Sequence, residues 1–274
     1  MNKKIFTIPP ELNGKRLDYI IGLFMDLPRK DAKKIVEDGF VLVNNLRVTF
    51  PSRKVKKGDK VILIEIEKSE SVLKILYEDR SVIVIDKPPG LITQRINSEA
   101  GYAVDEELRR MGKNIYPVHR LDRETSGVMV FACNTNARDF LMNEFRSHRV
   151  KKIYIGVVEG KLDKDKGVLR GKIQKTKEYA ETYYEVLKEL KGATLLKLFP
   201  RTGRTHQLRL QFAQIGNPIV GDKKYYKIKK PVILFERQAL HSYAIEFIHP
   251  EKKEWMRFTA PIPLDLKRLI ERLT

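Results

Sequence analysis

The chain has 274 residues and a formal net charge of +19 at pH 7, with 54 lysines and arginines against 35 aspartates and glutamates. Its hydrophobic content of 42% is enough for a substantial buried core, which excludes an intrinsically disordered chain. The positive charge favours a polyanionic partner, and nucleic acid is a better candidate than a membrane because no apolar run approaches the length that spans a bilayer.

Cysteine and histidine usage bounds the compartment and the metal chemistry. The first residues, "MNKKIFTIPPEL", lack the apolar core of a signal peptide, and the single cysteine, Cys133, has no internal disulfide partner. A cytoplasmic protein is therefore expected. No metal-ligand spacing and no phosphate-binding loop is present, so we predict neither a metal nor a cofactor. The five histidines concerned are His119, His148, His206, His241 and His249.

The first 68 residues predict a small domain of two helices followed by strands. Helices are predicted in "RLDYIIGLFMDL", from about Arg16, and in "RKDAKKIVEDG", which ends at Gly39. Strands are predicted in "FVLVNN", "VTFPSRKV" and "DKVILIEI". The second helix carries a basic stripe, but a merely solvated charged face would show the same pattern. The stripe consists of Arg29, Lys30, Lys33 and Lys34.

This segment resembles the αL-type RNA-binding domain that is named after a small-subunit ribosomal protein. The resemblance covers most of residues 14–66 and rests on the two helices, "DGFVLVNN" and the closing "KKGDKVILI". It implies that the basic stripe contacts RNA, mainly through phosphates and shape. The polar segment "EKSES", residues 67–71, is expected to be a linker. We therefore expect an RNA-binding domain over residues 1–68 and a second domain over residues 72–274.

The order of expected strands and helices in the second domain predicts an α+β fold without regular βαβ repeats. Strands are expected in "LKILYED", "SVIVIDKPPG", "ALHSYAIEFI" and "EWMRFTA", and at residues 128–133. Helices are expected near residues 103–111 and 135–147, in "RTHQLRLQFAQIG" and in "PLDLKRLIERL". Most of the net charge, +14, falls on residues 72–274, so RNA contact is expected across both domains.

A polar stretch, "HRLDRETSG" at residues 119–127, lies between two apolar segments. The downstream segment, "VMVFAC", reads as a buried strand, so the polar cluster sits where a strand enters the interior. Polar groups in that position need partners. Such clusters often serve functional sites, although they also build structural ion networks.

Three further motifs give this stretch a context. They are "YEDRSVIVIDKPPGL" at 77–91, "KKIYIGVVEG" at 151–160 and "RTGRTHQLRLQFAQIGNPIVGDKKY" at 201–225. In this order the four motifs resemble those of the RluA family of RNA pseudouridine synthases, and with the amino-terminal domain the chain is similar to the ribosomal large-subunit branch. The resemblance implies a mixed, largely antiparallel sheet, a cytoplasmic monomer without a cofactor, and ribosomal RNA as substrate, with transfer RNA as the second candidate.

The resemblance also assigns roles to individual residues. Asp122 matches the catalytic aspartate, Tyr154 the active-site tyrosine, and Arg209 the arginine that partners the aspartate. Arg120 matches the residue that fills the gap left by a flipped base, and Leu240 corresponds to an apolar wall of the uracil pocket. Beside them, we expect Arg204 and His206 to cap or brace the helix that follows.

The chemistry of the reaction agrees with these residue types. Pseudouridine formation breaks an N-glycosidic bond and rejoins the base through carbon, which calls for an ionised carboxylate but no redox cofactor. A guanidinium from Arg209 would favour the charged form of Asp122, and Tyr154 offers a ring for stacking and a hydroxyl for proton transfer. The sequence leaves open whether Asp122 attacks the sugar, attacks the base, or abstracts a sugar proton.

Two other functions remain open from the residues alone. A metal-dependent nuclease could use Asp122 and Glu124, two positions apart in an extended chain, to hold magnesium. A non-catalytic RNA chaperone or assembly factor would need only the amino-terminal domain and the charge. The nuclease would lose its activity with a chelator, and the chaperone would leave Tyr154 and Arg209 without a role.

Overall fold

The computed structural model describes residues 3–37, 39–44, 46–48, 50–64, 73–94, 103–173, 177–226 and 233–274. Two compact units make up the chain, one of residues 1–72 with 95–107 and one of residues 73–94 with 108–274. The expected linker at 67–71 lies outside the described residues. Across the described part of the chain, each helix is too short or too polar to cross a membrane.

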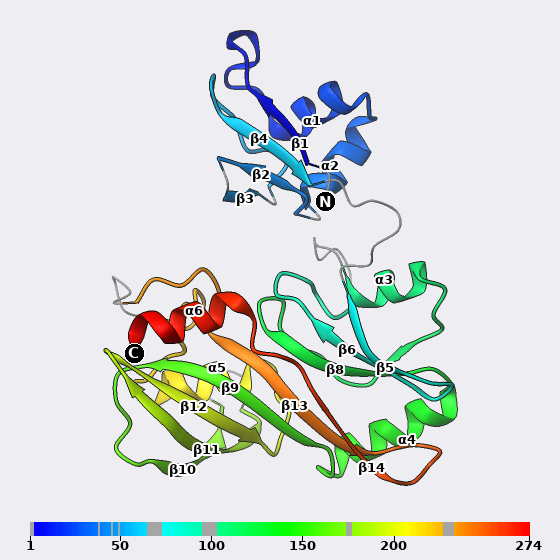
Figure 1. Ribbon diagram of the computed structural model, residues 1–274, viewed down its shortest axis with the longest axis vertical. Coiled ribbons are helices and arrows are strands. Elements are labelled where there is room, and N and C mark those ends of the chain that lie inside the picture. The colour runs from blue at the N-terminus through cyan, green and yellow to red at the C-terminus, as the bar shows by residue number, and fades with distance from the viewer. Residues whose placement is uncertain are drawn as a thin grey trace. The chain divides into compact units, whose positions relative to one another are not determined.

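The first unit contains a four-stranded antiparallel sheet in the order β1-β4-β2-β3 (Figure 1). Both predicted helices are confirmed. The predicted strand at residues 48–55 is wrong beyond its first residue, because Pro51 cannot donate to a ladder and the chain turns there. β1 was not predicted. The elements are β1 (Lys3–Thr7), a 3-10 turn η1 (Pro10–Leu12), α1 (Leu17–Met25), α2 (Arg29–Glu37), β2 (Val41–Val43), β3 (Leu46–Val48) and β4 (Lys60–Ile64).

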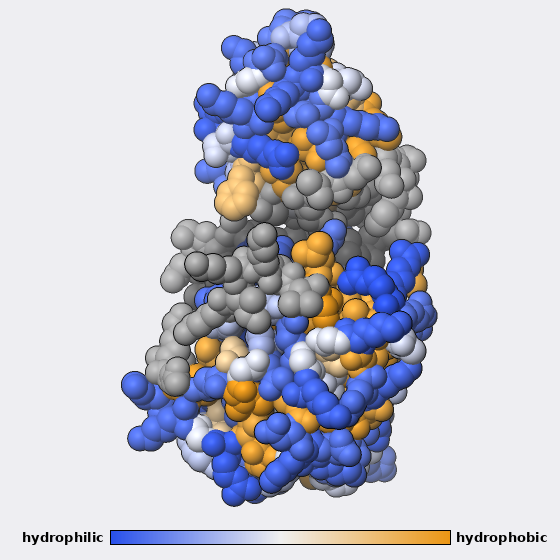
Figure 2. Space-filling model, turned by 90° about the vertical axis from the view of Figure 1, so that its left-hand side faces the viewer, coloured by the Kyte–Doolittle hydropathy of each residue, from blue (hydrophilic) through white to orange (hydrophobic). Residues whose placement is uncertain are grey.

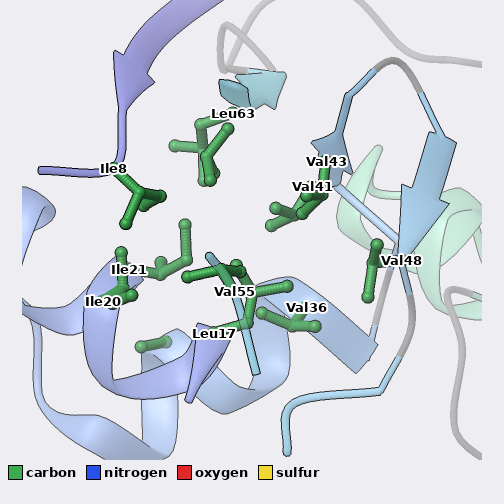
Figure 3. Packing of buried hydrophobic residues seen from close by; sticks show 12 residues of the cluster. Ile8, Leu17, Ile20, Ile21, Val36, Val41, Val43, Val48, Val55 and Leu63 are labelled. Atoms are coloured by element: carbon green, nitrogen blue, oxygen red, sulfur yellow. The ribbon is translucent and has the colours of Figure 1, made fainter. Parts of the chain in front are cut away.

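The core of this unit lies between the two helices and the sheet. Figure 3 shows aliphatic side chains from α1, α2 and the strands pointing toward one another. Leu17, Ile20 and Ile21 bury one face of α1, and Ala32 and Val36 bury one face of α2. Because the apolar residues of α2 face this core, its basic residues lie on the opposite, solvent-exposed side of the helix.

The second unit contains a ten-stranded mixed sheet that runs from β10 to β5 (Figure 1). Its order is β10-β11-β12-β9-β13-β8-β6-β5, with β14 beside β13 and β7 beside β8. The expected α+β class with a mostly antiparallel sheet is confirmed. The strands are β5 (Lys74–Glu78), β6 (Val82–Lys87), β7 (Tyr116–Pro117), β8 (Ser126–Ala132), β9 (Lys151–Glu159), β10 (Lys166–Lys172), β11 (Tyr179–Leu190), β12 (Ala193–Pro200), β13 (Leu240–Ile248) and β14 (Trp255–Thr259).

The helices predicted for the second domain are confirmed as well. They are α3 (Val104–Arg110), α4 (Thr135–Arg146), α5 (Gln207–Gln214) and α6 (Leu264–Leu273). Asn134 starts α4 as its N-cap, since its side chain accepts a hydrogen bond from the Ala137 amide. Leu266, Leu269 and Leu273 recur at helical spacing and bury one face of α6. Among the coloured residues in Figure 2, hydrophilic ones cover more of the face shown than hydrophobic ones, in keeping with the high charge.

One parallel strand pairing positions the polar stretch at residues 119–127. β8 and β13 pair in parallel at Ser126 with His241 and at Gly127 with Ser242. Gly127 has a φ of +112°, and a Cβ there would lie 2.1 Å from the Ser242 carbonyl oxygen. Only glycine permits this approach, which brings the end of the polar loop against the start of β13.

Candidate active site

A cleft of about 450 Å³ opens in the second unit, and it contains the polar loop identified from the sequence. Its walls come from the loop before β8, the end of α4, β9, the loop before α5, α5 itself and the start of β13. The structure brings together in this cleft all five site residues that the resemblance implied for the second domain. They are Arg120, Asp122, Tyr154, Arg209 and Leu240.

Asp122 and Arg209 are bonded to each other in this cleft. Arg209 Nη1 donates to Asp122 Oδ2 at 2.9 Å, and the Gln238 amide lies 3.5 Å from the same oxygen. Asp122 Oδ1 accepts no hydrogen bond from the described residues, and its nearest charged neighbour is His206 Nε2 at 3.7 Å. One carboxylate oxygen is therefore held in place while the other remains available to a substrate.

A second carboxylate fixes the arginine. Arg209 Nε and Nη2 donate to the two oxygens of Asp222 at 2.6 and 2.9 Å, and the guanidinium carbon lies 5.0 Å from the Tyr225 ring centre. Burial alone would lower the pKa of Arg209 and raise that of Asp222, but their mutual hydrogen bonds and opposite charges outweigh it and shift both values the other way. Both groups are therefore charged.

The backbone around Asp122 is anchored on either side. Thr93 Oγ1 exchanges hydrogen bonds with the amide and carbonyl of Leu121. The Lys87 ammonium is completely buried and donates to three carbonyls, including that of Arg123 at 3.0 Å. Burial lowers the pKa of Lys87 to about 7. These contacts fix the loop before any ligand binds, which is the preorganisation that a precise site needs.

Tyr154 lies on β9 and is 9% exposed. Burial raises the pKa of its hydroxyl, and a hydrogen bond with Ser242 offsets only part of that effect. The hydroxyl is thus protonated at neutral pH. Leu240, 4% exposed, pairs with the neighbouring Gly156 and adds an apolar wall to the cleft.

Arg120 is exposed at the cleft, and no ion pair within the described part of the chain engages it. Its guanidinium is free to meet a ligand that enters.

His206 and Arg204 brace the start of α5, but neither caps it. His206 occupies the N-cap position with a φ of 55°, yet its side chain makes no capping bond and instead pairs through Nδ1 with the Tyr225 hydroxyl at 2.7 Å. Arg204 donates to the Tyr179 carbonyl at 3.2 Å and pairs with Glu178 at 3.1 Å. Of the two expected roles, capping or bracing, the contacts fit bracing.

The basic stripe of α2 lies in the first unit, and the residues that line the cleft come from the second. Arg29 lies 3.7 Å from Asp18, and Lys33 lies 3.6 Å from Glu37. For Lys30 and Lys34, by contrast, the described residues offer no ion pair. The stripe is thus half neutralised by its own neighbours.

Sequence reasoning missed Asp222, Tyr225 and Gln238. The first two lie in "VGDKKY", inside a motif quoted above, but no role had been attached to them. Asp222 is 1% exposed, and a buried aspartate requires a partner. That requirement was the available signal, although burial itself could not be read from a loop sequence. In the described ranges no three metal-ligating side chains gather in one place.

Comparison with known proteins adds independent information. A family model described as RNA pseudouridylate synthase matches residues 81–214, and an S4 domain model matches residues 15–61. An uncharacterized RNA pseudouridine synthase from Aquifex aeolicus is 34% identical over 96% of this chain and 95% of its own. The ribosomal large subunit pseudouridine synthase D of Blochmanniella floridana is 32% identical over 94% of both chains.

A further relative, the ribosomal large subunit pseudouridine synthase C of Buchnera aphidicola, is 30% identical over 98% of this chain and 97% of its own. Among solved structures, human RNA Pseudouridylate Synthase Domain Containing 4 superposes with a TM-score of 0.61 at 23% identity, over 73% of this chain and 92% of that one. The structural likeness supports the fold, and the sequence likeness extends over both units.

Proposed function

Because the chain belongs to the RluA family of RNA pseudouridine synthases and carries an S4 RNA-binding domain, we propose that it converts specific uridines of large-subunit ribosomal RNA to pseudouridine. The reaction is an intramolecular isomerisation. Support for ribosomal RNA comes from the names of relatives that are 30–32% identical and from the positive charge of both units. The nuclease and the non-catalytic alternatives are disfavoured, since the family is one of isomerases.

The observation that carries the proposed site is the Asp122–Arg209–Asp222 network. Arg209 holds Oδ2 of Asp122 in place, and Oδ1 accepts no hydrogen bond within the described part of the chain. An ionised carboxylate in a cleft can stabilise a cationic sugar or act as a nucleophile. A single carboxylate suffices here because the base is rejoined to the same sugar.

The remaining cleft residues have roles in holding the base. A uridine must leave its stack to reach Asp122, which costs a few kcal/mol, and a side chain that fills the vacated space offsets part of that cost. We assign this part to Arg120. Tyr154 and Leu240 offer an aromatic and an aliphatic surface for the uracil, and we assign proton transfer to the Tyr154 hydroxyl.

Asp122→Asn tests the site. We expect the substitution to abolish isomerisation and to leave RNA affinity within a few fold, because one charge among many is removed and the shape is kept. Glu124→Gln is the matched control, since it removes a carboxylate from the same loop but outside the cleft lining. Isomerisation by Asp122→Asn at the wild-type rate would contradict the assignment, and equal losses in both variants would revive a two-carboxylate site.

The substrate is tested by mapping pseudouridines in total RNA from cells that lack the protein. Sites missing from large-subunit ribosomal RNA should return with the wild-type protein and stay absent with Asp122→Asn. If the missing sites lie in transfer RNA instead, the ribosomal substrate is wrong and the isomerase assignment stands.

A further inference from the structure

Lys152 lies in the cleft but has no role in the mechanism above. It precedes Tyr154 by two positions on β9, and alternate residues of a strand point to the same side of the sheet, so both side chains line the cleft. Its neighbour Lys151 points to the opposite side, where it pairs with Glu246 at 3.5 Å and lies 5.0 Å from the Trp255 ring centre.

The Lys152 ammonium is short of negative partners. Its Nζ donates to the Thr202 carbonyl at 2.8 Å, and no carboxylate of the described residues pairs with it. An ammonium has three N–H donors, so two remain to be used. Burial lowers the pKa of Lys152 to about 8, which leaves it largely protonated at neutral pH. A desolvated cation of this kind is stabilised by an anion that arrives with the ligand.

The surroundings leave one approach to this ammonium uncovered. A Cβ on Gly203 would lie 3.5 Å from Nζ, so the absence of a side chain there leaves the ammonium open on that side. His119 also lines the cleft, and its pKa is lowered to about 3, chiefly by burial and also by the charge of Lys152. His119 is therefore neutral, and because its Nε2 accepts from the Val130 amide, its proton is on Nδ1.

We propose that Lys152 binds a backbone phosphate next to the flipped uridine, and that it thereby holds the nucleotide at the depth where Asp122 meets the sugar. The substrate supplies the anion that Lys152 does not find among the described residues, since every nucleotide of RNA carries a phosphate beside its sugar. The neutral His119 can add an N–H donor without adding charge. This inference rests on the active site proposed around Asp122.

The first test compares Lys152→Met with Lys151→Met on an RNA oligonucleotide that carries the mapped uridine. Both variants lose one positive charge from adjacent positions of the same strand. We expect Lys152→Met to lower kcat/KM roughly 10- to 100-fold, the range for a lost hydrogen bond to a charged group, and to act mainly through KM. Lys151→Met should stay within about twofold, as for an exposed charge. Equal effects of the two variants would overturn the proposal.

The second test keeps the protein wild type and neutralises the phosphates one at a time as methylphosphonates. One phosphate beside the target uridine should cost the wild type as much kcat/KM as Lys152→Met does, and should cost Lys152→Met little more. Two variants complete the series: Lys152→Arg should retain the sensitivity, and Gly203→Ala should weaken binding by partly covering Nζ. A wild type that tolerates every neutralised phosphate, or additive losses in Lys152→Met, would overturn the proposal.

These outcomes are separate from those of the proposed function. Activity in Asp122→Asn would remove the active site that Lys152 is said to serve, whatever the phosphates show. A substrate other than ribosomal RNA would only change the oligonucleotide used. With Asp122 essential and Lys152 indifferent to the phosphates, the isomerase stands and the phosphate contact does not.

Discussion

Arg209 shows how much one side chain can determine in this site. Its guanidinium has two edges, and it gives two donors to Asp222 and one to Asp122. The planar fork suits this division, which the point charge of a lysine would not reproduce. Asp222 is not among the residues that line the cleft, but it holds the arginine that orients Asp122. We therefore regard Asp222 as a positioning residue.

Asp222→Asn tests this dependence. The amide keeps one acceptor but loses the charge and one hydrogen bond, so we expect kcat to fall about 10- to 100-fold, equivalent to about 1.4 to 2.8 kcal/mol, with KM nearly unchanged. Single-turnover rates and RNA binding separate the two quantities. Glu144→Gln is the control, because Glu144 also pairs with an arginine while nearly buried but lies outside the cleft lining. Equal losses of kcat in both would mean that only stability was affected.

Tyr154 combines two roles that substitution can separate. Tyr154→Phe keeps the ring, so RNA binding should stay close to normal while the rate falls by roughly a hundredfold, as for loss of an acid–base group. Tyr154→Leu should also lose affinity, because stacking on a base contributes about 1 to 3 kcal/mol. Tyr184→Phe, on β11 and outside the cleft lining, serves as the control. A fast Leu variant would reduce Tyr154 to a core residue.

At the scale of elements, Gly127 is where strand geometry and the site meet. Gly127→Ala combines a left-handed φ with a collision against β13, and the two effects together should lower Tm by roughly 5 to 20 °C. Gly171→Ala is the matched control, because Gly171 has a φ of +144° with no atom near the new Cβ. Thermal unfolding of both variants separates strain from collision. Equal shifts of Tm would show that the close approach to Ser242 is unimportant.

The helices were predictable because each carries its own periodic signal. The helical spacing of Leu266, Leu269 and Leu273 indicates α6, and Asn134, a residue type favoured at the N-cap, indicates the start of α4. Short strands carried less information. β1 spans five residues, and β3 ends before the turn that Pro51 imposes.

Some residues of the site could be predicted from local sequence motifs, whereas others could be found only from contacts between distant segments. The motifs located Asp122, Tyr154 and Arg209, since each lies in a recognisable stretch. The partners Asp222 and Gln238 come from separate segments, and only the folded sheet brings them to Asp122. Lys152 was missed because a lysine in a strand reads as an exposed charge until its neighbours are known.

For the whole molecule, charge is distributed over two units with different tasks. The described residues that line the cleft belong to the second unit, and the basic stripe of α2 belongs to the first. RNA affinity should therefore depend on both units, and the chemistry on one.

Removal of residues 1–68 tests this division. The remaining chain should still fold and should bind structured RNA more weakly. The slope of the logarithm of its binding constant against the logarithm of salt concentration should become shallower by roughly 0.7 to 0.9 per lost phosphate contact. Binding measured across a salt series gives the slope. In the full chain, Lys30→Ala with Lys34→Ala should reproduce part of the change, and Lys33→Ala less, since Lys33 already pairs with Glu37. An unchanged slope after removal would mean that the first unit does not anchor RNA.

The parallel pairing of β8 with β13 makes completion of the cleft depend on a late part of the chain. Ser126 and His241 are 115 positions apart, and such a distant closure is slow and comes after the local hairpins. While the chain is being synthesised, Asp122, Tyr154 and Arg209 leave the ribosome well before the strand that carries Leu240. A nascent chain that ends before Leu240 therefore carries Asp122, Tyr154 and Arg209 but lacks one wall of the cleft, and we expect it to be inactive.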